Sequence, residues 1–255
     1  SAVNLVVHDR TSYRTTNVRA RVTFAVGNTF GPSPTVEVDV RPTPLERAVS
    51  GRLLIIGASI TSRPGYVARL YEMLRDDPLA DVTMIGTFYQ KYEAARHEGR
   101  PGWRVSWYNE RPDSPFVNRG AFDFAAYLDA NGLEPPDWVF VHLGGNDVFY
   151  AESGAEIAKK NGDTLEAWLE NIRKAPGCGD TRLVAFTYIV ASSRFQPWQY
   201  IVKKGHELYC EDVYHRKHRE YAATMIDRFD RRQDEGFYML ALHPYLNDHD
   251  FGDTD

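Results

Sequence analysis

Residues 52–61, RLLIIGASIT, decide the fold of this chain. Four consecutive apolar residues form a strand buried on both faces, and Gly57 then turns the chain into a segment with helical spacing. The apolar residues of that segment recur at i, i+3, i+4 and i+7: Val67, Leu70, Tyr71 and Leu74. This predicts a helix that begins near Pro64 and packs its apolar stripe on a sheet.

Four more apolar runs alternate with helical patterns along the chain. They are DVTMIG (81–86), DWVFVHLG (137–144), TRLVAFTYIV (181–190) and FYMLAL (237–242). Helices are predicted near residues 121–130, after the capping pair Asp163 and Glu166, and over about residues 211–229. The alternation predicts an α/β domain with a parallel sheet of about five strands flanked by helices.

Residues 1–41 follow another pattern, in which apolar and polar residues alternate between Gly, Asn, Ser and Pro. Period-two alternation predicts half-buried antiparallel strands, and three of them are too few to close a sandwich. RVTFAVGNTFGPSPTVEVDV (21–40) weakly resembles the closing hairpin of an immunoglobulin-like module. We therefore predict a short N-terminal β segment over 1–41, a linker over 42–51, and the α/β domain over 52–255.

Composition excludes several classes of protein. The 255 residues are 43% hydrophobic and 25% charged with a formal net charge of -5, so no basic field exists to hold a nucleic acid. No run approaches ~18 uninterrupted apolar residues, which excludes a membrane span, and the first residues lack a secretory signal pattern. Cys178 and Cys210 are predicted to be free thiols.

Polar residues follow the first and third strands of the predicted sheet. Ser59 comes directly after the first strand, at the edge where open α/β sheets bind ligands. In HLGGND (142–147), two glycines let the backbone turn sharply and leave the Asn146 amide at the same edge, able to donate to a developing oxyanion. A helix-capping serine and an ordinary Gly-Gly-Asn turn are the simpler alternatives for each feature alone.

Three motifs together carry a family resemblance. Gly57-Ala58-Ser59, Gly102-Trp103 and Gly144-Gly145-Asn146-Asp147 resemble, in order, the first three sequence blocks of the SGNH, or GDSL-type, ester hydrolases. The resemblance covers about residues 52–255, and DSPF, GAFDFAAYL and PPDWVFVHLGGNDVF resemble a bacterial and phage-associated branch. It implies the SGNH hydrolase fold, with a flavodoxin-like parallel sheet, and esterase activity without a metal or organic cofactor.

The resemblance also implies residue roles. Ser59 is the expected nucleophile, and its own N–H, the Gly102 N–H and the Asn146 side-chain amide are the expected oxyanion hole. Trp103 and His97 are candidate substrate contacts, and a surface-loop role is the alternative for His97. Ala58 departs from the family, which usually has Asp at that position.

The nucleophile needs a base to take its proton and an acid to orient that base. The family supplies both as Asp-x-x-His near its C-terminus, and two assignments are open. In the first, which we favour, Asp255 opens that motif, the histidine follows beyond this sequence, and the domain lacks its C-terminal end. In the second, His243 is the base and an acid comes from elsewhere, for example Asp248 or Asp250, because Leu240 occupies the family's acid position.

The other histidines have simpler interpretations. His215 and His218 are predicted to belong to a charged surface helix rather than to a metal site, and His142 is predicted to be a core histidine. The acids of the C-terminal tail lack the spacing of a calcium loop, so no metal is predicted.

Aromatic residues are frequent in the loops expected at the carboxyl edge of the sheet. They are Trp103, Trp107, Tyr108, Phe116, Trp198 and Tyr200. Exposed rings suit the apolar faces of sugars, and packing within long loops is the equal alternative. No long apolar lid helix is apparent, so a short acyl group is expected.

The leading substrate is therefore an acetyl ester on a carbohydrate, which the resemblance also implies. The alternative function is a catalytically incomplete structural or glycan-binding module of a larger assembly such as a phage particle, in an extracellular or virion-associated setting. A lipase or thioesterase on the same scaffold is a third alternative.

Overall fold

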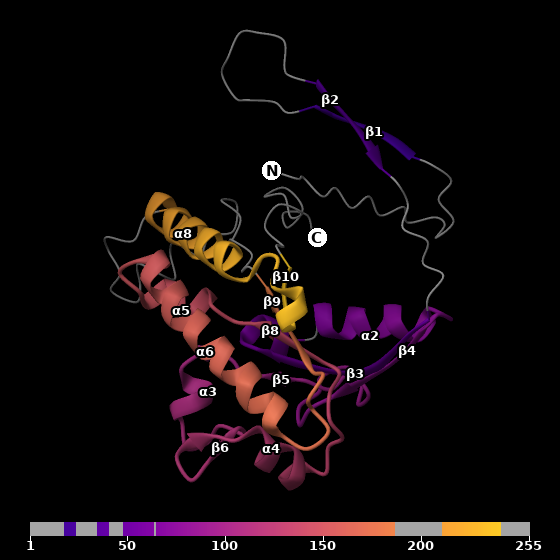
Figure 1. Ribbon diagram of the computed structural model, residues 1–255, viewed down its shortest axis with the longest axis vertical. Coiled ribbons are helices and arrows are strands. Elements are labelled where there is room, and N and C mark those ends of the chain that lie inside the picture. Colours follow the sequence, from indigo (N-terminus) through magenta and orange to yellow (C-terminus); the bar gives the residue numbers. More distant parts are fainter. Residues whose placement is uncertain (1–17, 24–34, 41–47, 64, 187–210, 241–255) are drawn as a thin grey trace. The chain divides into compact units, whose positions relative to one another are not determined.

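The computed structural model describes residues 18–23, 35–40, 48–63, 65–186 and 211–240 (Figure 1). The chain divides into two compact units, Ser1–Ala48 and Val49–Asp255. In the first unit, β1 (Val18–Thr23) pairs antiparallel with β2 (Thr35–Val40). The further strand predicted near residues 4–10 lies outside the described residues.

The second unit is built on a parallel sheet. Its strands are β3 (Val49–Gly57), β4 (Ala80–Ile85), β8 (Trp138–His142), β9 (Arg182–Phe186) and β10 (Phe237–Leu240), in the spatial order β10-β9-β8-β3-β4. Each strand coincides with one of the five predicted apolar runs, so the predicted α/β parallel sheet is confirmed. Because β3 already pairs with β4 from Val49 onward, residues 49–51 belong to the sheet rather than to the predicted linker.

The strand order positions the site. The first strand of the sheet, β3, lies between β4 and β8, so the chain winds one way to β4 and the other way to β8 and beyond. The carboxyl ends of β3 and β8 therefore flank the point where the winding reverses. Doubly wound sheets bind ligands in the crevice at this point.

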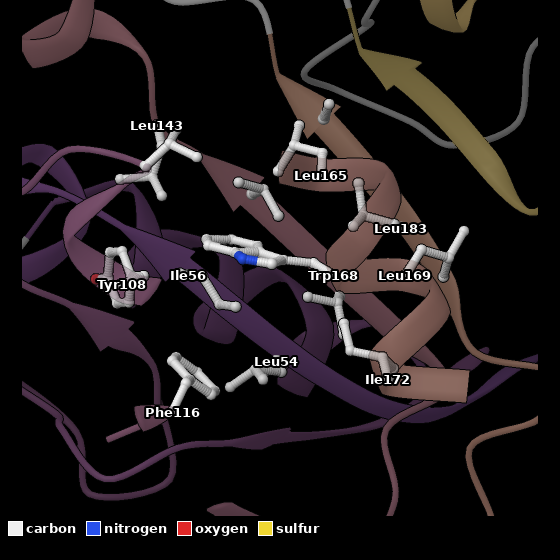
Figure 2. Packing of buried hydrophobic residues seen from close by; sticks show 14 of the residues in the cluster. Leu54, Ile56, Tyr108, Phe116, Leu143, Leu165, Trp168, Leu169, Ile172 and Leu183 are labelled. Carbon is white, nitrogen blue, oxygen red and sulfur yellow. The ribbon is translucent and has the colours of Figure 1, made fainter. Parts of the chain in front are cut away.

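Helices cover both faces of the sheet because neighbouring residues of β3 point in opposite directions. Leu53 and Ile55 pack with α2 (Tyr66–Asp76) on one face. Leu54 and Ile56 pack on the other with α6 (Gly154–Lys174), and Figure 2 shows the Trp168 ring projecting from that helix toward them. Every one of these strand residues is buried, which makes β3 the centre of the core.

The predicted helices exist, but some of their boundaries differ. α4 (Phe124–Asn131) ends at left-handed Gly132 and α8 spans Glu211–Phe229, as predicted, whereas α4 begins later than residue 121 because Ala121–Phe122 form a short strand. The helix predicted after β3 is split into α1 (Ser59–Ser62) and α2. The capping pair predicted for α6 is wrong, because the Ser153 hydroxyl caps this helix by accepting the Glu156 N–H.

The supposed capping residues of α6 instead join it to α8, beside it in Figure 1. Arg228 pairs with Asp163 and with Glu166, both at 2.7 Å. Arg232 adds a pair of 2.6 Å with Glu166. The two pairs of Glu166 are partly buried and the pair of Asp163 is exposed, and all three join α6 to the C-terminal end of α8 and the residues after it.

Short elements complete the unit. They are β5 (Glu98–Gly99), α3 (Trp107–Glu110), β6 (Val117–Asn118), β7 (Ala121–Phe122), α5 (Gly145–Tyr150) and the 3₁₀ helix Gln233–Glu235. None of the helices within the described residues is both long and apolar enough to cross a bilayer.

Candidate active site

Ser59 is the first residue of α1, directly after the carboxyl end of β3. Its carbonyl oxygen accepts the Ser62 hydroxyl at 3.0 Å and the Arg63 N–H at 3.1 Å, which fixes the backbone of the turn. Its own hydroxyl has no hydrogen-bond partner among the described residues. A side chain at Gly57 would collide with Thr61, so this tight turn needs glycine.

The second motif is fastened to the same strand end. β5 pairs in parallel with β3, with Gly99 beside Gly57, and the Arg100 N–H donates to the Gly57 carbonyl at 2.9 Å. Gly102 lies in the exposed turn that follows, with φ +80°, a conformation that favours glycine. The β3–β5 pairing thus brings the Gly102 loop to the end of the strand that carries Ser59.

The third motif is bonded to the second. The Asn146 amide nitrogen donates to the Trp103 carbonyl at 2.9 Å, and the Asp147 carboxylate accepts the Val105 N–H at 3.0 Å. An asparagine amide carries two N–H donors, so one remains for a ligand. Three loops that are distant in sequence are therefore held together by their own hydrogen bonds at one edge of the sheet.

Asp147 is a buried acid within this arrangement, with an exposed fraction of 4%. Burial raises the pKa of Asp147 to about 6, while the Val105 N–H and the Asn161 side chain oppose the shift by stabilising the carboxylate. Asp147 had no function predicted from the sequence. The sequence places an aspartate in the third motif, but it does not indicate that this aspartate accepts a hydrogen bond from the Val105 N–H of another loop.

A second buried acid supports the same edge. Glu98 accepts the Thr87 N–H at 2.7 Å and the Tyr127 hydroxyl at 2.9 Å, and pairs with Arg100 at 3.1 Å. The Arg100 guanidinium lies 5.1 Å from the Trp103 ring centroid. The sequence did not predict this pair, because its burial depends on Thr87 and Tyr127, which lie in other segments of the chain.

The candidate substrate contacts are both buried. His97 is 2% exposed and accepts the Gly99 N–H on Nδ1 at 2.9 Å, and burial lowers its pKa to about 4. The surface-loop interpretation of His97 is wrong, because its backbone pairs with that of Phe88. The Trp103 ring packs edge-on to Tyr108, with 4.8 Å between centroids.

Other aromatic residues also take core positions. Tyr108 and Phe116 are fully buried, which favours the packing interpretation of these loops. Exposed rings near this edge include Phe88 and Tyr89, which follow β4, and Tyr150 at the end of α5; none of them was singled out in the sequence.

His142 and His218 are both buried. His142 contacts Tyr66 and Phe186 at centroid distances of 5.3 and 5.5 Å, and burial lowers its pKa to about 4, so the predicted core role is confirmed. The predicted surface position of His218 is wrong, because its side chain lies on the face of α8 that is buried within the second unit. In the part of the chain that the structure describes, no group of three or more His, Cys, Asp or Glu residues forms a metal site.

His243, Asp255, Asp248 and Asp250 lie outside the described residues, as do Trp198, Tyr200 and Cys210. Across residues 48–63, 65–186 and 211–240, no histidine forms a hydrogen bond with the Ser59 hydroxyl.

The chain was compared with known proteins. No protein-family model matches it, and no curated protein matches its sequence. It is similar in fold to solved structures of SGNH/GDSL esterases.

Three of these structures illustrate the similarity. A catalytic mutant of Axe2, an acetylxylan esterase from Geobacillus stearothermophilus, is 16% identical with a TM-score of 0.46, over 79% of this chain and 81% of that one. TesA is 18% identical with a TM-score of 0.39, over 69% and 74% of the two chains. A lipolytic protein of the G-D-S-L family from Desulfitobacterium hafniense DCB-2 is 13% identical with a TM-score of 0.37, over 75% and 77%.

Proposed function

We propose that this chain is a serine esterase of the SGNH type that hydrolyses short acyl esters, with acetylated carbohydrates as substrates. The observation that carries the proposal is the hydrogen bonding among the three motifs. Arg100 binds Gly57, and Asn146 binds Trp103, so Ser59 shares the sheet edge with Gly102 and the Asn146 amide. A nucleophile beside several N–H donors is the arrangement that acyl transfer requires.

In the proposed reaction, the Ser59 oxygen bonds to the ester carbonyl carbon while its proton passes to the base. The carbonyl oxygen becomes an oxyanion, which accepts the N–H groups of Ser59 and Gly102 and the second amide hydrogen of Asn146. The C–O bond to the alcohol then breaks, and the base returns the proton to the alcohol. Water attacks the acyl-serine in the same way and releases the carboxylic acid.

The base is proposed to be a histidine outside the described residues. His97 and His142 are poor candidates because both are buried, with pKa values lowered to about 4. His243 and the histidine of a motif opened by Asp255 remain the two assignments. In a polypeptide that includes the natural downstream residues, loss of activity in His243→Ala would favour His243, and unchanged activity would favour the histidine of the Asp255 motif.

The carbohydrate part of the proposal has one support in the described residues. Phe88 and Tyr89, 41% and 47% exposed, follow β4 at the edge of the sheet that also carries Ser59. Exposed aromatic rings suit the apolar faces of sugars.

The test is hydrolysis of 4-nitrophenyl acetate by the whole chain and by Ser59→Ala. We expect kcat to fall by roughly 10³-fold or more, because the variant has no nucleophile. Ser50→Ala is the matched control, since Ser50 is exposed at the opposite end of the same strand. A series of longer acyl esters and thioesters separates an acetylesterase from a lipase or thioesterase.

Retained activity in Ser59→Ala would overturn the proposal. A whole chain that is inactive, and stays inactive when natural downstream residues are added, would favour the catalytically incomplete module. Ala58 supports this alternative, because the resembled family usually has Asp at that position.

A further inference from the structure

A pocket of about 230 Å³ lies beside the loop that follows Gly102, between that loop, α5 and α6. Its polar lining consists mainly of Arg104, Ser106, Asp147, Lys160, Asn161 and Thr164. The volume is below the ~300 Å³ at which sites for drug-sized ligands begin, so the pocket suits one small group. Asp147 connects it to the candidate active site, because the preceding residue is Asn146.

Arg104 is the unusual residue in this pocket. Its half-buried guanidinium lies over two aromatic rings, 4.1 Å from the Tyr150 centroid and 5.2 Å from that of Trp107. Within the described part of the chain it forms no ion pair, and its Nε atom is buried without a hydrogen-bond partner. Because this Nε atom is closed off from solvent, as is that of Arg100, a ligand oxygen would meet the terminal N–H groups of the Arg104 guanidinium instead.

The neighbouring arginines differ from Arg104. Each has a carboxylate partner: Arg96 pairs with Glu93, Arg100 with Glu98, and Arg111 with Asp113. These arginines are already neutralised by the chain itself. Arg104 forms no such pair; its charge favours the ionised Asp147 carboxylate in the same pocket, and the cavity beside it leaves room for an anionic group from outside the chain.

The charges in the pocket define the ligand further. Arg104 and Lys160 supply two positive charges, and the Asp147 carboxylate, which accepts the Val105 N–H, supplies one negative charge. The net charge of one positive suits a monoanion rather than a dianion such as a phosphate monoester. A planar guanidinium binds a carboxylate through two parallel N–H···O bonds, which a lysine cannot do.

We propose that this pocket binds the carboxylate of an acidic sugar residue, with Arg104 as its main partner. The hydroxyl groups of Ser106 and Thr164 would then bind the hydroxyls of the sugar ring. Carboxylate binding in the pocket is independent of catalysis. Its role as a substrate subsite rests on the proposed function.

Calorimetric titration of the whole chain with sodium D-glucuronate tests the binding. We expect saturable binding of glucuronate, at least tenfold weaker binding of uncharged D-glucose, and at least tenfold weaker binding of glucuronate by Arg104→Gln. Arg104→Lys, which keeps the charge without the planar fork, should fall between Arg104→Gln and the unmodified chain. Arg96→Gln is the matched control and should bind like the unmodified chain, and thermal unfolding verifies that each variant is folded.

Equal affinity for glucose and glucuronate, or unchanged affinity in a folded Arg104→Gln, would overturn the proposal. Inorganic sulfate that binds as tightly as glucuronate would overturn its sugar part, because the pocket would then be a simple anion site.

The subsite role is tested with O-acetylated methyl glucuronoside and the matching methyl glucoside. We expect Arg104→Gln to reduce the ratio of kcat/KM for the charged over the uncharged ester about tenfold, through KM. An unchanged ratio would overturn the subsite role. Ser59→Ala separates the two proposals, because it should abolish hydrolysis and leave glucuronate binding intact.

Discussion

The turns that follow β3 and β8 lie side by side at the same sheet edge, yet they are held in different ways. In the turn after β3, the backbone is fixed by Ser62 and Arg63, and the Ser59 hydroxyl has no partner among the described residues. In the turn after β8, both polar side chains are bound, Asn146 to Trp103 and Asp147 to Val105. The first turn leaves its functional group available, and the second uses its groups to hold another loop.

This difference matches the two tasks of the proposed reaction. A nucleophile must exchange its proton and form a bond, so an internal partner would compete with the substrate. Oxyanion donors work best when they are fixed before the reaction, because reorganisation then costs nothing in the transition state. The comparison predicts that stability depends on the β8 turn and little on the Ser59 side chain.

Gly144→Ala should have the largest effect on stability. Gly144 has φ +112°, and a Cβ there would lie 2.5 Å from the hydroxyl oxygen of Tyr221, which is buried. We expect a loss of roughly 3 kcal/mol in the free energy of unfolding, measured in urea, from strain and overpacking. Gly120→Ala is the control, since Gly120 has φ +82° with nothing within 4 Å, and a cost equal to that of Gly144→Ala would contradict the role of Tyr221.

Asp147→Asn should change how stability depends on pH. The folded-state pKa of about 6 lies above the value of ~3.9 for an unfolded aspartate, so the protonated acid favours folding below pH 4 and this contribution is lost as pH rises through 6. Asparagine keeps an acceptor for Val105 without the buried charge. We expect the variant to be the more stable form at pH 8 by up to about 3 kcal/mol, at 1.36 kcal/mol per pKa unit, and this gap to close near pH 4.

Unfolding free energies at pH 4, 6 and 8 check the Asp147 prediction. Asp123→Asn is the control of opposite sign, because the Ala126 N–H lowers the pKa of Asp123, and its loss should destabilise the fold above pH 4. A gap for Asp147→Asn that stays constant with pH would rule out the buried charge as its cause.

Asn146→Ala should lower the free energy of unfolding less than Gly144→Ala does, but it should lower kcat strongly. The variant loses the hydrogen bond to Trp103, worth about 1 kcal/mol of unfolding free energy. It also loses one proposed oxyanion donor, which should lower kcat for 4-nitrophenyl acetate by roughly 10²–10³-fold. Asn118→Ala, which removes an exposed bond to Asp123, should leave kcat unchanged. Similar kcat values for the two variants would exclude Asn146 from the oxyanion hole.

Ser59→Ala should have the smallest effect on stability. Because the hydroxyl bonds to no described residue, we expect the free energy of unfolding to change by less than about 0.5 kcal/mol. A loss above 1 kcal/mol would show that this side chain has a structural partner, and the contrast between the two turns would fail.

The strands were predictable because each is a short apolar run between breaks, whereas the start of α6 was not. Ser153 and Glu156 have the same spacing as Asp163 and Glu166, so the capping pattern alone does not choose between them. Gly154 suggests a break in the sequence, but α8 requires it, because a Cβ there would collide with the Lys217 carbonyl. A glycine that permits close helix packing looks like a loop glycine until its neighbour is known.

The candidate site divides in the same way. The roles of Ser59, Gly102 and Asn146 stay predictions, which the sequence permits because three short motifs in order resemble those of a known family. The partners of Asn146 and Asp147 were not predictable, because they are backbone atoms of Trp103 and Val105, which almost any residue supplies. The burial of His97 and His218 could not be predicted from the sequence either, because it depends on elements that are distant along the chain.

Because of the hydrogen bond between the Val105 N–H and Asp147, the hydrogen-exchange rate of this one amide reports how often the loop after Gly102 separates from α5. The Val105 N–H points at a buried carboxylate, so it exchanges with deuterium only when the loop separates from α5 or the whole unit unfolds. Faster exchange at Val105 than at a core amide of β3 would therefore measure local opening of the proposed oxyanion hole, while equal rates would mean that it opens only when the whole unit unfolds.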